Sequence, residues 1–449
     1  MSRRLHNPVR IALLVALTTL GGFAEDRYLV KVNGDVNAVA QRHGLTVVKS
    51  LTGSAAGRHV LSSKGAPPQS VLSDLIGEAA VNSAETEKPV RLPGIKPAAP
   101  VHPSNSPAGS TSFSSSLIRY YNSFAASAYV TQPATQVINM DQAHTLATGK
   151  GTVATIDTGV DFTHSVLRGS LNPGWDFVHN LPLGQEIADL NQETTPILDQ
   201  ETTPILDQET TPILDGGSAI ILQQETTPIL DQETTPILDG KKYPAFGHGT
   251  MVAGLIHLVA PGARIMPLRA FGADGSATIS QIVEAIYYAV DHKVDVINMS
   301  FSVAQDSPSL REALDFAAAK GIICVASAGN DGQATQVWPA AYGTVMGIAS
   351  TNNQKIRSLF SNYGNSLVTL AAPGEGVITT YPAEHYAQVW GTSFSAPMVA
   401  GAAALLLDVD HKTDESQAVS DLSHAVAIGQ ELGAGELDLY QAVVAAKKK

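Results

Sequence analysis

Cysteine is nearly absent from this sequence, since Cys324 is the only one. A single thiol cannot form an intrachain disulfide, so the fold is not a disulfide framework. Cys324 lies in the apolar stretch "GIICVAS". Apolar surroundings disfavour the thiolate form that acts as a nucleophile, so we expect an inert thiol in the core.

Basic residues are also scarce. The chain has 28 Lys and Arg against 41 Asp and Glu, and its formal net charge is −13. Five copies of one acidic octapeptide supply −10 of this charge, which leaves the rest of the chain near −3. A chain with this excess of acidic residues shows no basic composition that would bind phosphates, so we expect no nucleic-acid partner.

Long apolar runs are missing except at the N-terminus. There, "MSRRLHNPVR" is basic, "IALLVALTTLGGFA" is apolar, and small residues precede a cut after Ala24. This pattern is typical of a signal peptide over residues 1–24 and predicts a secreted protein, extracellular or periplasmic; the alternative is a buried N-terminal helix. The run is short for a transmembrane helix, so we expect no membrane span after signal cleavage.

Two segments follow the predicted signal peptide. Residues 25–93 contain the strand-like runs "RYLVKV", "LTVVKSL" and "RHVLSS" and the helix-like runs "DVNAVAQRHG" and "PQSVLSDLIGEAAV", which indicate a small α+β unit. Residues 94–116 are mostly Pro, Ala and Ser. That composition cannot bury a core and indicates a linker.

Residues 117–449 have the pattern of an α/β domain. Runs such as "GTVATIDTG", "VDVINMSFS" and "GIICVASAGN" are apolar on both faces and alternate with helical stretches. This predicts a mostly parallel sheet covered by helices on both sides, a three-layer α/β/α fold. Ligands bind beyond the C-terminal ends of such strands, which directs attention to Asp157, Asn330, Ser300 and Ser302.

An insertion interrupts this domain. Residues 192–239 hold five identical "QETTPILD" octapeptides and one interposed "GGSAIILQ". A proline in every copy blocks a continuous helix, and the acidic, Thr-rich octapeptide has few apolar residues that could pack in a core. We expect an extended excursion from the domain; a small β-layer that stacks the Ile-Leu pairs remains the alternative.

Three segments carry residues of one chemistry. Asp157 ends "VATID", His248 opens "HGTMVAGLI" and Ser393 lies in "GTSFSAPMVAG". A serine hydroxyl becomes a nucleophile when an imidazole takes its proton and a carboxylate orients that imidazole. Asn330 ends "SAGN", and its amide together with the Ser393 backbone N–H could stabilise an oxyanion.

The order of these motifs resembles the subtilase family of subtilisin-like serine peptidases, over roughly residues 117–446 with the insertion set aside. The resemblance implies a subtilisin-like fold, a catalytic triad of Asp157, His248 and Ser393, and an oxyanion hole of Asn330 and Ser393. It implies that residues 25–93 form an inhibitor-type propeptide; an independent adaptor domain is the alternative. It also implies the following substrate-binding residues: Ser300, Phe301, Ser302, Ser327, Gly329 and Val337.

The sequence departs from the family at three places. The stretch after His248 has no loop of oxygen ligands, and "HSVL" at residues 164–167 replaces the family's "HPDL". We therefore expect no calcium at the usual strong site and no other cofactor, while weaker calcium sites stay open. Bulky Val337 stands where many members have Gly, which predicts a shallow S1 pocket that prefers Ala, Val or Leu.

The predicted function is that of a secreted serine endopeptidase, made as a zymogen that processes itself. Its expected partners are polypeptide substrates and its own propeptide as an intramolecular inhibitor, and we expect a monomer. One alternative is a catalytically idle binding protein on the same scaffold, which displays the acidic repeat. Another is an esterase, which the extended substrate strand at residues 299–302 disfavours.

Overall fold

The computed structural model describes residues 26–63, 68–92, 116–186, 220–221 and 244–449. The predicted signal peptide lies outside this part of the chain. So do the predicted linker, apart from Ser116, and the octapeptide copies.

The first unit is a four-stranded antiparallel sheet with strand order β2-β3-β1-β4 and two helices. Helix α1 begins after Asp35, whose carboxylate accepts from the Asn37 N–H at 2.9 Å and so caps the helix. Helix α2 ends at Ile76, earlier than the predicted stretch, because Val81 already opens strand β4. The elements are β1 (Asp26–Val32), α1 (Val36–Arg42), β2 (Leu45–Ser50), β3 (Arg58–Ser63), α2 (Pro68–Ile76) and β4 (Val81–Thr86).

An eight-stranded sheet forms the centre of the larger unit, with strand order β10-β9-β12-β8-β14-β15-β16-β17. All neighbours are parallel except β10, which is antiparallel to β9. The strands are β8 (Thr152–Asp157), β9 (Gly174–Asp176), β10 (Leu181–Leu183), β12 (Arg264–Arg269), β14 (Val296–Met299), β15 (Ile323–Ser327), β16 (Met346–Thr351) and β17 (Leu370–Pro373).

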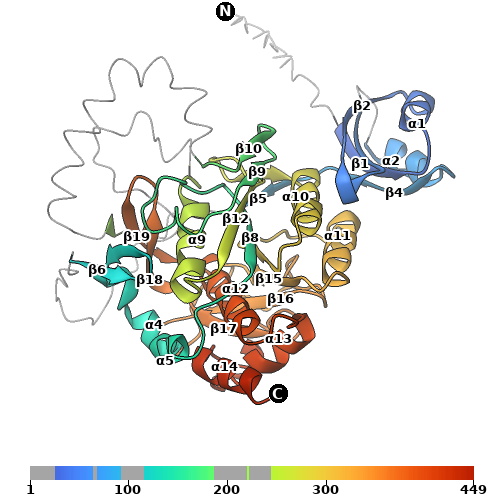
Figure 1. Cartoon of the computed structure of the whole chain (residues 1–449). Coiled ribbons are helices and arrows are strands. Elements are labelled where there is room, and N and C mark those ends of the chain that lie inside the picture. Colours follow the sequence, from blue (N-terminus) through green and yellow to red (C-terminus); the bar gives the residue numbers. More distant parts are fainter. Residues whose placement is uncertain (1–25, 64–67, 93–115, 187–219, 222–243) are drawn as a thin grey trace, which may run out of the picture.

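Helices cover both faces of this sheet, as the apolar strands predicted (Figure 1). Alternate residues of one strand face opposite sides: Val153 packs in the cluster that contains α9 and α12, and Ala154 packs in the cluster that contains α10 and α11. The three-layer α/β/α prediction is therefore confirmed. The covering helices are α9 (His248–Val259), α12 (Thr392–Val409), α13 (Glu415–Leu422), α14 (Leu439–Lys447), α10 (Ile279–Asp291) and α11 (Pro308–Ala318).

Smaller elements complete the unit. Strand β19 pairs with β18 and, in parallel, with the two-residue strand β11 from the segment between the octapeptide copies. Strand β5 pairs with β13, and β6 pairs with β7. These elements are β5 (Pro89–Arg91), β6 (Leu117–Tyr120), β7 (Ser123–Ala126), α3 (Ser127–Val130), α4 (Pro133–Val137), α5 (Met140–His144), β11 (Ile220–Ile221), β13 (Ser276–Thr278), β18 (Glu375–Tyr381) and β19 (His385–Trp390).

Candidate active site

Asp157 is the last residue of β8 and is almost completely buried. Its Oδ1 accepts from the Thr158 N–H at 2.8 Å and lies 2.7 Å from Nδ1 of His248. A carboxylate can only accept, so Nδ1 of the imidazole is the donor. In the neutral ring, Nε2 is then the nitrogen that can take a proton.

His248 is the first residue of α9, and two glycines let the helix start where it does. Gly247 has φ +90°, which is the left-handed region that suits glycine. A Cβ on Gly249 would lie 2.0 Å from the carbonyl oxygen of Gly159. The helix thus begins in direct contact with the backbone that follows Asp157, and this contact brings the imidazole to the carboxylate.

Ser393 lies in the first turn of α12, which packs against α9. The ring of its neighbour Phe394 lies 5.5 Å from the His248 ring, centroid to centroid. In this structure the Ser393 hydroxyl donates to the Ser300 carbonyl at 3.1 Å, while the Ser300 hydroxyl donates to the Ser393 carbonyl at 2.8 Å. Rotation about the Cα–Cβ bond of Ser393 would turn this hydroxyl away from the Ser300 carbonyl and toward a different acceptor.

Asn330 follows β15 and is held against the start of α12. Its Oδ1 accepts from the Thr392 N–H at 2.9 Å and from the Thr392 hydroxyl at 2.8 Å. With the oxygen fixed, the NH₂ group is the donating half of the amide. The first N–H groups of a helix also lack intrahelical acceptors, so donors gather around Ser393.

The predicted substrate-binding residues fall into two groups. Phe301 is buried against Phe271, with 5.1 Å between ring centroids, and the buried Ser327 hydroxyl donates to the Phe301 carbonyl at 3.3 Å. Their side chains are therefore structural. Strand β14 ends at Met299, so residues 300–302 continue outside the ladder and offer their backbone at the sheet end.

Gly329 and Val337 belong to the loop between β15 and β16 and lie side by side. Gly329 has φ +92°, and a Cβ built there would lie 3.4 Å from Cγ2 of Val337. The Gly329 N–H donates to the Thr392 hydroxyl at 3.2 Å, and this hydrogen bond links Gly329 to the start of α12. Val337 is 6% exposed.

Glu186 is a site residue that the sequence reasoning missed. It is fully buried, and its Oε1 accepts from the Thr158 hydroxyl at 2.6 Å and from the Gly247 N–H at 2.7 Å. Burial raises its pKa to about 7, against the hydrogen bonds that lower it. No local signal marks it, because its partners lie 28 to 64 residues away along the chain.

The segment that follows the N-terminal sheet reaches the edge of this site. Strand β5 pairs with β13, and the N–H of Leu92 donates to the Gly275 carbonyl at 2.8 Å. A Cβ on Gly275 would contact both Leu92 and Ala245, whose carbonyl accepts from the His248 N–H at 3.1 Å. The chain therefore reaches the neighbourhood of His248 before residue 93.

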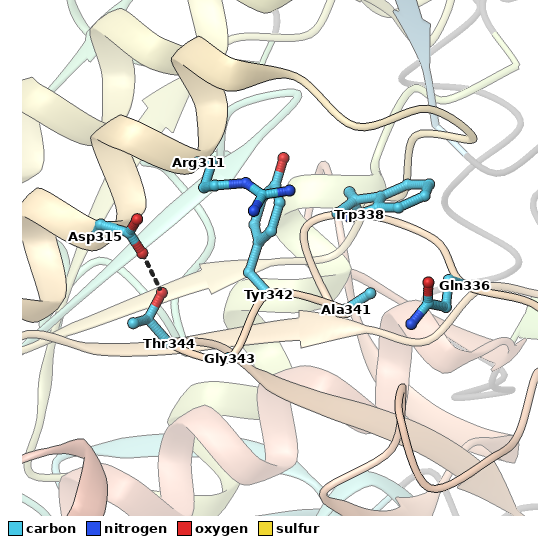
Figure 2. A pocket seen from close by; sticks show the side chains of 8 residues that line it. All are labelled: Arg311, Asp315, Gln336, Trp338, Ala341, Tyr342, Gly343 and Thr344. Carbon is cyan, nitrogen blue, oxygen red and sulfur yellow. Dashed lines mark hydrogen bonds between the residues drawn. The ribbon is translucent and has the colours of Figure 1, made fainter.

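A surface pocket of about 430 Å³ is lined by residues of α11 and of the loop between β15 and β16, and it does not contain the candidate catalytic residues. Figure 2 shows two contacts among its side chains: Asp315 accepts from the Thr344 hydroxyl at 2.9 Å, and Arg311 lies over the Tyr342 ring at 5.1 Å. Its lining is Arg311, Asp315, Gln336, Trp338, Ala341, Tyr342, Gly343 and Thr344.

Other expectations concern metals, the thiol and membranes. Within the described ranges, no three His, Cys, Asp or Glu side chains gather as a metal site; the expectation of no calcium stays a prediction. Cys324 is buried, and burial raises the pKa of its thiol, as expected of a core thiol. Among the described helices, α12 alone has the length and apolarity to cross a membrane, and 89% of it is buried inside the protein.

The amino-acid sequence of the chain is similar to those of known proteins. A model of the subtilase family matches residues 149–433. Thermitase of Thermoactinomyces vulgaris is 32% identical over 282 residues, which cover 60% of this chain and 80% of thermitase. A thermophilic serine proteinase of Bacillus sp. (strain AK1) is 32% identical over 293 residues, which cover 65% of this chain and 61% of that proteinase.

Solved structures resemble the chain in fold. The crystal structure of fervidolysin from Fervidobacterium pennivorans has a TM-score of 0.65 at 20% sequence identity. That similarity covers 94% of this chain and 61% of fervidolysin.

Proposed function

The chain belongs to the subtilase family of serine-type endopeptidases, and from this we propose that it hydrolyses polypeptides with Asp157, His248 and Ser393 as its catalytic triad. The observation that carries the proposal is the 2.7 Å contact between Asp157 and His248, made beside α12, which holds Ser393 in its first turn. This arrangement supports the roles of nucleophile for Ser393, base for His248 and orienting carboxylate for Asp157.

The proposed reaction has two steps that share one base. His248 Nε2 takes the Ser393 proton as Oγ attacks the peptide carbonyl, and it then protonates the leaving amine. Water completes the hydrolysis of the acyl-enzyme through the same imidazole. Asp157 stabilises the imidazolium formed in each step, because its carboxylate lies next to Nδ1.

Asn330 and the Ser393 N–H form the proposed oxyanion hole. The Asn330 amide is oriented by two hydrogen bonds to Thr392, so it need not reorganise when negative charge develops. Loss of one such donor costs on the order of 10²–10³-fold in turnover. The reaction itself needs no cofactor in this proposal.

Substrate is proposed to bind in extended form beside residues 300–302, through backbone hydrogen bonds. Its P1 side chain would enter the space bounded by Gly329 and Val337. The proximity of these two residues supports a shallow S1 pocket, because a β-branched side chain fills space there.

We also propose that the N-terminal unit is the inhibitory propeptide of a zymogen. Charged groups hold it to α10 and α11: Lys49 pairs with Glu284, and Arg58 pairs with Glu312 at 2.9 Å and lies over the Tyr287 ring. Strand β5 adds to β13 at the edge of the site, and we propose that the first cut falls on its C-terminal side. The similarity in fold to fervidolysin, at 94% of this chain, includes this unit.

Export by a signal peptide over residues 1–24, to the cell exterior or a periplasm, completes the proposal. The test is expression of wild type, Ser393→Ala and the control Ser395→Ala, followed by mass spectrometry of the products. Ser395 is a buried serine on the same helix. We expect wild type and Ser395→Ala to lose the N-terminal unit and Ser393→Ala to retain it. A folded wild type that never processes itself would instead fit an idle binding protein.

A further inference from the structure

Glu186 joins the two chain segments that carry Asp157 and His248. Its Oε1 accepts from Thr158, the neighbour of Asp157, and from Gly247, the neighbour of His248. Its Oε2 accepts from the N–H of Thr250 at 3.3 Å and from the Thr250 hydroxyl. One side chain thus bridges the end of β8 and the first turn of α9.

The partners of Glu186 all act as donors. The two backbone N–H groups can only donate. The Thr158 hydroxyl already accepts from the Gly249 N–H at 2.9 Å, and the Thr250 hydroxyl accepts from the Asp161 N–H at 2.9 Å, so both O–H bonds point to Glu186. An ionised carboxylate accepts all four bonds, whereas a protonated carboxyl would set an O–H against a donor.

Helix α9 also lacks a cap of its own. Its N-cap residue is Gly247, which has no side chain to accept from the first turn. Glu186 takes this role from another segment, since it accepts the N–H of Gly247 and that of Thr250. A carboxylate at a helix N-terminus is also favoured by the helix dipole.

We propose that Glu186 is a positioning residue of the catalytic site, whose carboxylate holds the start of α9 against the end of β8 and so keeps His248 at Asp157. This inference rests on the proposed triad. The ionisable groups that interact electrostatically with Glu186 are Asp157 and Tyr381. Burial and the neighbouring charge of Asp157 oppose the ionised state of Glu186, while its hydrogen bonds favour that state, and the pKa of the carboxyl is raised to about 7.

The first test compares Glu186→Gln with the matched control Glu436→Gln. Glu436 is equally buried, and its pKa is also raised to about 7, but its backbone pairs with Val426 and Ala371 and its carboxylate does not join the triad segments. In Glu186→Gln the amide hydrogens would face the donors of Thr250. We expect kcat on a small peptide to fall on the order of 10–10²-fold with KM changed less than about threefold, because a misplacement of about 1 Å has such an effect. Glu436→Gln should keep both constants within about twofold.

The second test needs no activity. In a Ser393→Ala background, the Nδ1 proton of His248 is followed by ¹H NMR against pH. Removal of a nearby carboxylate should lower the apparent pKa of His248 by about half a unit or more in Glu186→Gln and leave it unchanged in Glu436→Gln. If Glu186→Gln does not fold, Thr158→Val removes one of the four bonds, and kcat should fall about threefold or more.

The outcomes separate this inference from the proposed function. Unchanged kcat and an unchanged His248 titration in folded Glu186→Gln would overturn the positioning role while the triad stands. Equal losses of kcat in Glu186→Gln and Glu436→Gln would also overturn it, because the loss would then be a general effect of replacing a buried carboxyl. Retained activity in Ser393→Ala would overturn the proposed triad itself.

Discussion

Val337 is the residue that most directly limits the proposed S1 pocket. Val337→Gly removes a branched side chain beside Gly329, so larger P1 side chains gain room. We expect the ratio of kcat/KM for Phe over Ala at P1 to rise about tenfold or more, because room for one more methylene in an apolar pocket changes kcat/KM by about this factor.

A peptide library that varies P1 measures this ratio. Val345→Gly is the control, since Val345 is a buried valine further along the same loop. It should leave the ratio unchanged. An unchanged ratio in Val337→Gly as well would place Val337 outside S1.

His257 makes the protein sensitive to acid. Burial lowers its pKa to about 4, helped by nearby His164, and its Nε2 has no hydrogen-bond partner among the described residues. The unfolded chain takes up this proton near pH 6.5 and the folded protein only near pH 4, so stability falls as pH drops through this window. Between pH 7 and 4.5 this residue accounts for about 2 kcal/mol of that loss.

Urea unfolding of Ser393→Ala protein at both pH values tests this. His257→Asn should shrink the difference in unfolding free energy between pH 7 and 4.5 by about 2 kcal/mol, whatever its effect at pH 7. The control His411→Asn changes an exposed histidine and should leave this difference unchanged. An undiminished difference in His257→Asn would contradict the assignment.

At the scale of elements, apolar runs predicted the central strands because a sheet buried on both faces needs apolar side chains at every position. The motifs around Asp157, His248 and Ser393 were equally visible, since each follows a strand or opens a helix. The bridge made by Glu186 was not visible, because it depends on the register of residues 184–186 against 159–160. Contacts that join distant segments leave no periodic trace in a sequence.

The packing of α12 on α9 depends on a glycine. A Cβ on Gly401 would lie 2.8 Å from Cβ of Val259, closer than two such atoms normally approach. We expect Gly401→Ala to destabilise the protein by about 1–2 kcal/mol, since overpacking outweighs the gain in helix propensity.

Thermal and urea unfolding in the Ser393→Ala background measure this effect. Gly343→Ala is the control, because a Cβ there meets nothing within 4 Å. Its stability should change by less than about 0.5 kcal/mol. A Gly401→Ala protein as stable as this control would show that the two helices adjust freely.

At the scale of the whole molecule, the insertion separates Asp157 from His248 in sequence while the sheet brings them to 2.7 Å. Long surface insertions cost little in closure entropy. We therefore expect deletion of residues 192–239 to keep kcat/KM on small peptides within about threefold. A loss of more than tenfold in a folded deletion variant would assign the repeat a part in catalysis.

The most direct measurement of the proposed active site is labelling by a fluorophosphonate probe, with the modified peptide identified by mass spectrometry. We predict a single labelled residue, Ser393, in the mature protein. Asp157→Asn should slow the labelling by several orders of magnitude, because the amide favours the wrong imidazole tautomer. Labelling at another serine, or none in a folded and processed protein, would contradict the assignment of Ser393 as the nucleophile.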